Sequence, residues 1–235
     1  IKILYICIIL MVENFYEKID SKFLDVKHNN PNFDLHGFKI PFRACVVAPS
    51  GSGKSNFVVN LISLFSKGKG TFNTIHIICK DADEPLYKYL ASKSPSIIVK
   101  EGLHELPDLD KFDKSDCSLV IIDDMVMERN QRQICEYYIR CRKKSVSIMY
   151  LSQSFYAIPK VIRINCSYLI ILKMSGDRDV NLVLKESGIG LSKEQLMKAY
   201  EYATSEKLVP LIVNIEESDK NKKFRRGFTE LIQMT

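Results

Sequence analysis

The chain of 235 residues has no tryptophan and little glycine or proline, with 10 and 8 residues respectively. This composition excludes collagen-like and low-complexity chains, which are rich in both. No stretch reaches the roughly 20 apolar residues that a membrane-spanning helix needs. Hydrophobic residues make up 46% and charged residues 26% of the sequence, as in ordinary globular proteins. We therefore expect one folded domain with a short tail, and no membrane partner.

The cysteines lack the spacings of a metal site or a disulfide framework. No C-x-x-C pair occurs, and no histidine stands at zinc-ligand distance from a cysteine. An odd number of cysteines, several within apolar runs, also argues against a secreted disulfide protein. We expect reduced core cysteines in an intracellular protein that is not secreted. The seven are Cys7, Cys45, Cys79, Cys117, Cys135, Cys141 and Cys166.

Residues 1–10, IKILYICIIL, are apolar but too short to span a bilayer. They do not begin with methionine, and no small-residue cleavage site follows them. Three interpretations stay open: translation of upstream sequence with Met11 as the true start, a short buried strand or helix, and a signal peptide. We favour the first, and we treat residues 1–37 as an N-terminal segment ahead of the main domain.

From residue 38 onward, apolar runs rich in β-branched residues alternate with helix-like segments, and this alternation indicates a parallel sheet with helices on both faces. Continuous apolar runs are typical of strands that are buried on both faces. The expected strands are 43–49, 74–80, 96–100, 118–124, 145–153, 168–172 and 208–215. The expected helices are 54–65, 84–92, 130–144, 177–186 and 192–204. The main domain would then span residues 38–215, followed by a basic tail over residues 216–235.

Two helix boundaries carry specific signals. Ser192 and Gln195, in the sequence SKEQ, form a capping-box pattern in which each side chain can satisfy a backbone amide of the other. Gly188 suits the end of the preceding helix, because glycine readily adopts the left-handed conformation found there.

Residues 48–55, APSGSGKS, match the phosphate-binding loop G-x-x-x-x-G-K-[ST], with Ala48 at the first glycine position. The glycines let successive backbone amides turn toward phosphate oxygens at a helix N-terminus. Lys54 would reach the β- and γ-phosphates, and the Ser55 hydroxyl would bind Mg²⁺. An ordinary Gly-Ser turn is the weaker alternative, because a strand precedes the loop and a helix follows it. The predicted nucleotide-binding residues are Pro49, Ser50, Gly51, Ser52, Gly53, Lys54, Ser55 and Asn56.

The sequence SLVIIDD, residues 118–124, is an apolar strand that ends in two carboxylates, the Walker B pattern. Parallel strands bring their carboxyl ends to one edge of a sheet, where ligands bind. Asp123 is therefore predicted to hold Mg²⁺, and Asp124 to orient or deprotonate the attacking water. The next strand ends in Gln153 at the same edge, where its amide is predicted to sense the γ-phosphate.

The order of these motifs also predicts the type of nucleotide-binding fold. A strand between the P-loop and the Walker B strand, and a carboxylate after the Mg²⁺ ligand, distinguish motor-type ATPases from GTPases. The guanine motif N-K-x-D is missing, since NKKF at 221–224 has Phe224 in place of the aspartate. The expected fold class is a P-loop NTPase of the RecA-like (ASCE) type, a three-layer α/β/α sandwich around a mostly parallel sheet.

Three stretches together resemble the genome-packaging ATPases of poxviruses, giant viruses and virophages, in the FtsK-HerA superfamily. They are FRACVVAPSGSGKSNFVVNLI, LVIIDDM and RCRKKSVSIMYLSQSFYAIPKVIRINCSYLIIL. The resemblance implies an ATP-driven ring, a hexamer or pentamer, that moves double-stranded DNA into a capsid. It implies ATP and Mg²⁺ as cofactors, and DNA, further copies of the chain and capsid proteins as partners. The implied location is the virion or a virus factory in the host cytoplasm.

The same resemblance matches Asp123 and Asp124 to the metal-binding and water-activating acids and Gln153 to the sensor. FtsK and HerA carry glutamate where Asp124 stands, so the shorter side chain reaches less far. A ring motor also needs an arginine finger from the neighbouring subunit, which increases the rate by about 10³ to 10⁵. Arg163 is the favoured candidate and Arg178 the alternative, with Arg140 and Arg142 also considered.

The net charge of +6 favours an anionic partner, although an ordinary solvated surface explains it as well. A DNA pore should present lysine and arginine to phosphates without reading bases. Residues 140–144 (RCRKK) and 220–226 (KNKKFRR) are the two basic clusters available. The first also suits a helix C-terminus, and the second a subunit interface.

Two other functions fit the same motifs. A DNA helicase or conjugative DNA pump would share the active site, and an ATP-binding structural protein of the virion would bind nucleotide with negligible turnover. The two acids and Gln153 favour turnover, and the short chain favours a minimal packaging motor.

Overall fold

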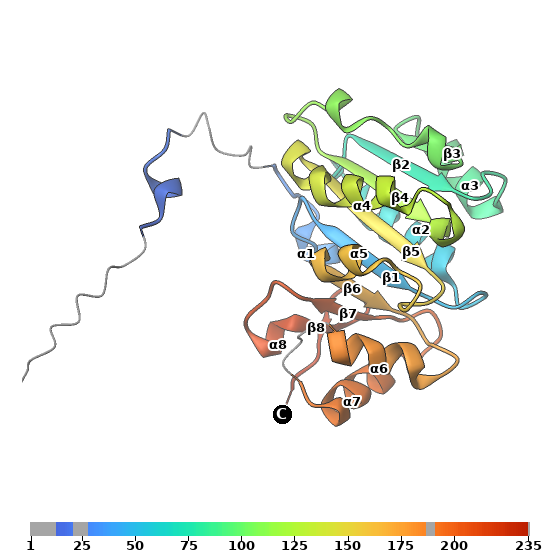
Figure 1. Ribbon diagram of the computed structural model, residues 1–235, viewed down its shortest axis with the longest axis vertical. Helices are drawn as coiled ribbons and strands as arrows, with labels where there is room; N and C mark the ends of the chain where they lie inside the picture. Colours follow the sequence, from blue (N-terminus) through green and yellow to red (C-terminus); the bar gives the residue numbers. More distant parts are fainter. Residues whose placement is uncertain (1–12, 21–27, 187–190, 235) are drawn as a thin grey trace, which may run out of the picture.

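The computed structural model describes residues 13–20, 28–186 and 191–234. Its centre is a nine-stranded sheet in the order β3-β2-β4-β5-β1-β6-β7-β8-β9 (Figure 1). The first six strands in this order pair in parallel, and the last three pair antiparallel. The expected α/β class and mostly parallel sheet are confirmed.

All seven predicted strands form, with bounds within three residues of those expected. The sensor strand β5 lies between the P-loop strand β1 and the Walker B strand β4, which is the predicted motor-type order. The strands are β1 Arg43–Val47, β2 Thr74–Cys79, β3 Ile97–Glu101, β4 Ser118–Asp123, β5 Val146–Ser152, β6 Tyr168–Ile171, β7 Leu211–Asn214, β8 Phe224–Arg226 and β9 Glu230–Leu231.

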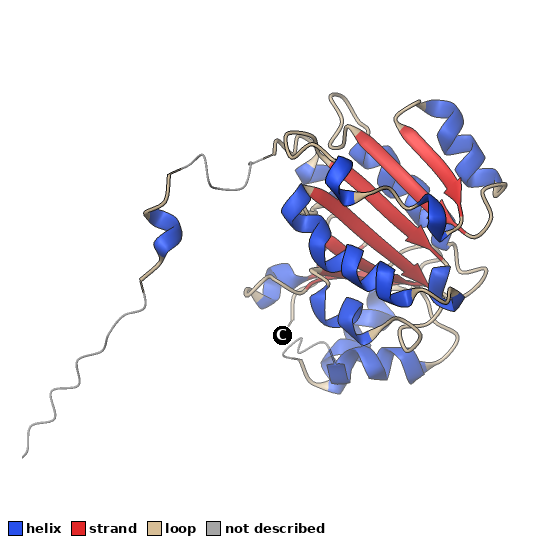
Figure 2. Ribbon diagram, turned by 45° about the horizontal axis from the view of Figure 1, so that its top comes forward, coloured by secondary structure: helices blue, strands red, loops and turns tan. Residues whose placement is uncertain are grey.

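Helices cover both faces of the sheet, which gives the three predicted layers (Figure 2). One face packs against α2 Lys54–Phe65 and α3 Pro85–Lys93. The other packs against α4 Gln131–Arg140, α5 Lys160–Asn165, α6 Asp177–Glu186 and α7 Lys193–Ala203. Shorter elements are α1 Phe33–His36, α8 Lys220–Lys223 and the 3-10 turns Phe15–Glu17, Leu103–Glu105, Leu109–Lys111, Met125–Met127 and Cys141–Lys144.

The alternation of side chains along the central strands builds two cores. In β1, Ala44 and Val46 contribute to one core, and Cys45 and Val47 to the other. Every residue of β4 and of β5 is buried. Burying one large apolar side chain stabilises the fold by about 1.5 to 3 kcal/mol, so these strands form a rigid frame for the groups at their ends.

The predicted helix boundaries agree with the structure to within one residue, except at the end of the helix expected over 130–144. Ser192 and Gln195 form both hydrogen bonds of the capping box. The helix expected over 130–144 ends at Arg140 and continues as a 3-10 turn up to Lys144, before Ser145 with a positive φ of 59°. The predicted stop at Gly188 lies outside the described residues. Helix α5 was not predicted, because Pro159 and its six-residue length hide it in the sequence.

The main domain extends beyond the expected residues 38–215 at both ends. Residues 216–234 differ from the expected tail, since β8 pairs with β7 and Phe224 is fully buried. At the other end, the Asn32 side chain donates to the carbonyls of Phe65 and Lys67 at 3.0 and 2.9 Å. Residues 1–10 lie outside the described part of the chain.

The six described cysteines are free thiols, and five of them are buried, as expected of core residues. Within the described ranges, no helix combines the length and the apolar character required to cross a membrane.

Candidate active site

The P-loop joins the carboxyl end of β1 to the start of α2. Gly51 and Gly53 have φ values of 74° and 93°, which side chains rarely adopt. Ala48 is fully buried and is not among the described residues with positive φ, so alanine fits the first glycine position. Gly53 caps α2 without a side-chain hydrogen bond. The first amides of α2 therefore remain available for an anion.

Lys54 and Asp123 meet at this edge of the sheet. The Lys54 Nζ lies 2.9 Å from Oδ1 of Asp123 and 4.0 Å from Oδ1 of Asp124. The Lys54 and Asp123 side chains are only 13% and 8% exposed, so their attraction is screened less than that of a surface pair. Asp123 thus neutralises the lysine that is predicted to bind phosphates.

Tyr87 of α3 also contacts Asp123. Its buried hydroxyl donates to Oδ2 of Asp123 at 2.6 Å. Burial first, and the charge of Asp123 second, raise the pKa of Tyr87 far above its usual range, so the hydroxyl stays protonated as a donor. The same two causes raise the pKa of Cys79 to about 11. Sequence reasoning missed Tyr87, because it lies 36 residues from Asp123 in a helix with no motif.

Asp124 and Gln153 lie beside this pair and touch each other. Asp124 has a left-handed backbone with φ of 56°, which turns the chain away from the end of β4. The Gln153 side chain donates to Oδ2 of Asp124 at 3.0 Å. Strands β4 and β5 are neighbours, with Asp123 opposite Leu151, so the two predicted residues follow adjacent strand ends. The Asp124 side chain is 31% exposed, which leaves it open to solvent.

With this geometry in place, comparison with known proteins assigns the family. The family described as "Poxvirus A32 protein" matches residues 33–224. The chain belongs to the poxvirus A32 protein family. The predicted resemblance to poxvirus-type packaging ATPases is thereby confirmed.

Solved structures share the fold of this A32-family chain at low sequence identity. The genome packaging NTPase B204 from Sulfolobus turreted icosahedral virus 2, in complex with sulfate, is 12% identical with a TM-score of 0.55, covering 76% of this chain and 94% of that one. B204 from Sulfolobus turreted icosahedral virus, a DNA-packaging ATPase, is 14% identical with a TM-score of 0.54 and the same coverage.

EssC (ATPases 2 and 3) from Geobacillus thermodenitrificans is 11% identical with a TM-score of 0.51, covering 74% of this chain and 38% of that one. At these identities the likeness shows the fold. No curated protein matches the A32-family chain.

Magnesium fits the oxygen groups at the end of β4. Mg²⁺ prefers oxygen ligands and keeps several waters, so it needs few protein groups. Asp123 supplies a carboxylate, and Ser55 directly follows Lys54, whose Nζ lies 2.9 Å from that carboxylate. The two predicted metal ligands therefore belong to elements that meet at this edge of the sheet.

A cavity of about 440 Å³ adjoins the P-loop and is large enough for part of a nucleotide. One wall is formed by residues 49–52 of the loop, and the other by residues 173–175 and 204–208. Leu208 has a positive φ of 70°. A Cβ atom on Gly53 would lie 2.0 Å from its Cδ2 atom, so this packing requires glycine.

The two main finger candidates differ in their surroundings. The Arg163 guanidinium donates to the carbonyls of Phe155, Tyr156 and Ile158, and lies 5.3 Å from the Phe155 ring centroid. Arg163 therefore stabilises the loop between β5 and α5 within its own subunit. Arg178 is exposed and stacks over the exposed ring of Tyr156 at 5.1 Å.

The basic cluster at 140–144 lies away from the P-loop, because it precedes β5 while the P-loop follows β1. Lys144 is 2.7 Å from Asp110, and Arg142 is 3.6 Å from Glu216. Arg140 also approaches Asp110 at 3.9 Å. The structure does not bring Arg140 and Arg142 to the nucleotide edge.

Proposed function

We propose that this protein is an ATP-hydrolysing motor that moves double-stranded viral DNA into a capsid. The observation that carries the proposal is the meeting of Lys54, Asp123, Asp124 and Gln153 at one sheet edge, beside a P-loop with open helix amides. Membership of the A32 family supports genome packaging as the process that this chemistry serves.

Nucleotide binding would exchange one set of ion pairs for another. The amides of residues 50–56 would hold the phosphates, and Lys54 would leave Asp123 for the β- and γ-oxygens. That move frees Oδ1 of Asp123, while Tyr87 keeps the carboxylate oriented through Oδ2. Bound Mg²⁺, held by Ser55 and Asp123, would neutralise charge on the phosphates. ATP and Mg²⁺ would thus replace the ion pair between Lys54 and Asp123.

Hydrolysis then requires a base and a positioned water. Asp124 would accept a proton as the water oxygen bonds to the γ-phosphorus and the bond to the ADP oxygen breaks. Gln153 now binds Asp124 and would turn toward the γ-phosphate. The next residues are tied to α6, because Ser154 Oγ and the Tyr156 amide both donate to Asp179. A change at Gln153 would therefore be transmitted to the Arg178 segment.

The motor would work as a homo-oligomeric ring, a hexamer or pentamer, in the virion or a virus factory. Arg178 is the better placed trans finger, since it is exposed on α6, the helix that is tied to the residues after Gln153. Arg163, in contrast, donates to three carbonyls of its own chain. Double-stranded DNA would run through the ring, with capsid proteins as further partners.

The test is the rate of ATP hydrolysis with duplex DNA, with single-stranded DNA and with none, over a range of protein concentration. A packaging motor predicts stimulation by duplex DNA that increases cooperatively with protein concentration. Stimulation by single strands alone would favour a helicase. Tight binding of ATP without turnover under every condition would leave the structural virion protein.

A further inference from the structure

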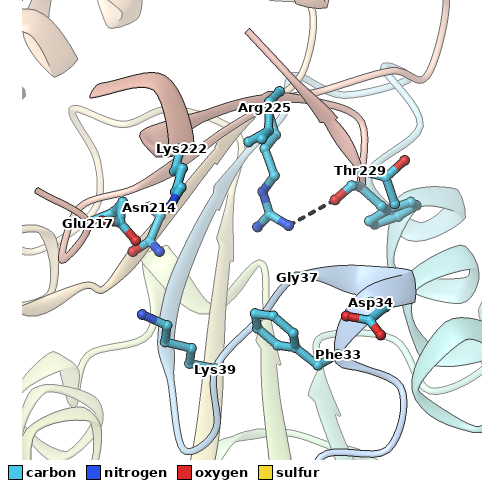
Figure 3. Close-up of a pocket in the computed structure, with 11 residues that line it drawn as sticks. Phe33, Asp34, Gly37, Lys39, Asn214, Glu217, Lys222, Arg225 and Thr229 are labelled. Carbon is cyan, nitrogen blue, oxygen red and sulfur yellow. Dashed lines mark hydrogen bonds between the residues drawn. The ribbon is translucent and has the colours of Figure 1, made fainter. Parts of the chain in front are cut away.

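A second cavity lies near the amino edge of the parallel strands, because residues 33–39 that line it precede β1, whereas the P-loop follows β1. Its volume is about 370 Å³, and it opens where residues 33–39 meet residues 214–231. The side chains of Lys39, Lys222 and Arg225 converge on it (Figure 3). Neither the family nor the proposed hydrolysis gives this cavity a role.

Arg225 forms the base of the cavity and is only 6% exposed. Its Nη1 donates to the carbonyls of His36 and Phe228, at 2.9 and 2.8 Å. Its Nη2 is buried and has no hydrogen-bond partner among the described residues. No carboxylate of the described chain lies within ion-pair distance of it. Figure 3 shows the Arg225 side chain extending from β8 toward Phe33 and Lys39.

A buried cation without an acid partner is costly, and a buried donor without an acceptor adds to that cost. The backbone nevertheless fixes the guanidinium in place. Gly37 has a positive φ of 68°, and a Cβ atom there would lie 1.6 Å from Nη1 of Arg225. The neighbouring His36 stays neutral, because burial and the Arg225 charge lower its pKa to about 4.

The mouth of the cavity adds two exposed ammonium groups, Lys39 and Lys222. Two carboxylates, Asp34 and Glu217, also line it, so the cations exceed the anions by one. Lys222 lies 3.8 Å from Asp219, a distance typical of a weak surface pair. Glu217 accepts from the Asp219 amide at 3.1 Å. The Arg225 guanidinium, deepest in the cavity, lies 5.3 Å from the Phe38 ring centroid and has no carboxylate partner among the described residues.

We propose that this cavity binds a phosphate group, with Arg225 at its base and Lys39 and Lys222 at its mouth. Phosphate offers several acceptor oxygens and up to two negative charges, which suits three cationic donors better than a single carboxylate does. The group comes either from free phosphate ions or from the backbone of DNA. The site goes beyond the proposed hydrolysis and does not depend on it.

The test measures binding of inorganic phosphate by titration calorimetry in the Lys54→Ala background, which weakens phosphate binding at the P-loop. Arg225 also anchors two loops, so the variant is Lys39→Gln with Lys222→Gln, which changes only exposed side chains. Charge-assisted hydrogen bonds of this kind predict an affinity at least about tenfold lower than in the parent. The matched control, Lys67→Gln with Lys69→Gln, removes the same charge from an exposed loop at the same edge and retains the parent affinity.

A second arm titrates a short DNA duplex and distinguishes the two sources of phosphate. If the DNA backbone occupies the cavity, the Lys39/Lys222 variant loses more duplex affinity than the control, and free phosphate competes with DNA. If free phosphate occupies it, only phosphate binding decreases. Both results support the site. The proposal is overturned if the parent binds no phosphate, or if the two double variants bind it equally well.

Discussion

Among the described residues, each edge of the sheet holds one charged side chain that is more than nine-tenths buried, Asp123 at the carboxyl edge and Arg225 near the amino edge. At the carboxyl edge, both oxygens of Asp123 are engaged, one by Lys54 and the other by Tyr87. Near the amino edge, Arg225 binds two carbonyls through Nη1 while its Nη2 has no partner among the described residues. Similar burial therefore produces a balanced pair at one edge and an unbalanced charge at the other.

The difference shows two ways in which a buried charge can be held in place. A site that must exchange partners during a reaction benefits from an internal counter-charge, which the substrate then displaces. A site that only binds an anion can contain a buried cation without a carboxylate partner, provided that hydrogen bonds to the backbone fix the position of this cation. The first arrangement suits turnover, and the second suits binding. The variants below test this contrast, beginning with the largest expected effect.

Replacing Lys54 by alanine should abolish most of the turnover. Removing one group that stabilises transition-state charge typically lowers the rate about 10²- to 10³-fold, and we expect at least this loss in kcat. Steady-state ATP hydrolysis measures it. Lys69→Ala, which removes an exposed lysine near the amino edge, is the control and should leave the basal rate unchanged. Equal rates in the two variants would contradict the assignment of the carboxyl edge.

Asp124→Asn should lower kcat about 10²- to 10⁴-fold, the range that general bases contribute. Asparagine retains the shape and can still bond to Gln153, so nucleotide affinity should change little. Single-turnover hydrolysis and nucleotide titration separate the two quantities. Asp110→Asn, which makes the same substitution at an exposed carboxylate near the amino edge, is the matched control. A rate within twofold of wild type for Asp124→Asn would exclude it as the base.

Tyr87→Phe should destabilise the fold, because it leaves Oδ2 of buried Asp123 without its donor. The expected loss is about 1 to 3 kcal/mol in the free energy of unfolding, measured by urea denaturation. Tyr137→Phe is the matched control. The Tyr137 hydroxyl is buried without a partner in the described chain, so its removal should be neutral or stabilising. Equal losses in both variants would refute the positioning role of Tyr87.

The amino edge should make stability depend on pH through His36. Burial, then the charge of Arg225, lower the pKa of His36 from 6.5 to about 4. The unfolded chain therefore binds more protons between these pH values, and stability should decrease as pH falls from about 6.5 to about 4. Thermal unfolding of His36→Asn should show a shallower pH dependence than wild type.

The exposed His104 provides the control for this measurement, and His104→Asn should keep the wild-type slope. Half-buried His76 also has a pKa lowered by desolvation, so some pH dependence persists in every variant. If the pH dependence of thermal unfolding is the same in His36→Asn as in wild type, the lowered pKa of His36 is contradicted.

Much of the fold, and the proximity of the candidate site residues, could be predicted from sequence, since parallel strands bring their carboxyl ends to one edge of the sheet. Lys54, Asp123, Asp124 and Gln153 each follow a strongly apolar strand. Tyr87 could not be predicted, because its contact with Asp123 depends on how α3 packs.

The amino edge was harder to predict for similar reasons. Strand β8 is short and basic, FRR, and resembles a solvated tail until Phe224 is seen in the core. The burial of Arg225 depends on Gly37, nearly 190 residues earlier in the chain. Local sequence patterns cannot predict such a contact.

Hydrolysis of ATP by the wild-type protein, measured as phosphate release with Mg²⁺ and again with the metal chelated, tests the central claim most directly. In the proposed function, Asp123 at the carboxyl edge would exchange Lys54 for a metal-bound nucleotide. This predicts steady turnover that requires Mg²⁺ and increases with duplex DNA. Phosphate release that is independent of Mg²⁺, or nucleotide binding without any release, would contradict it.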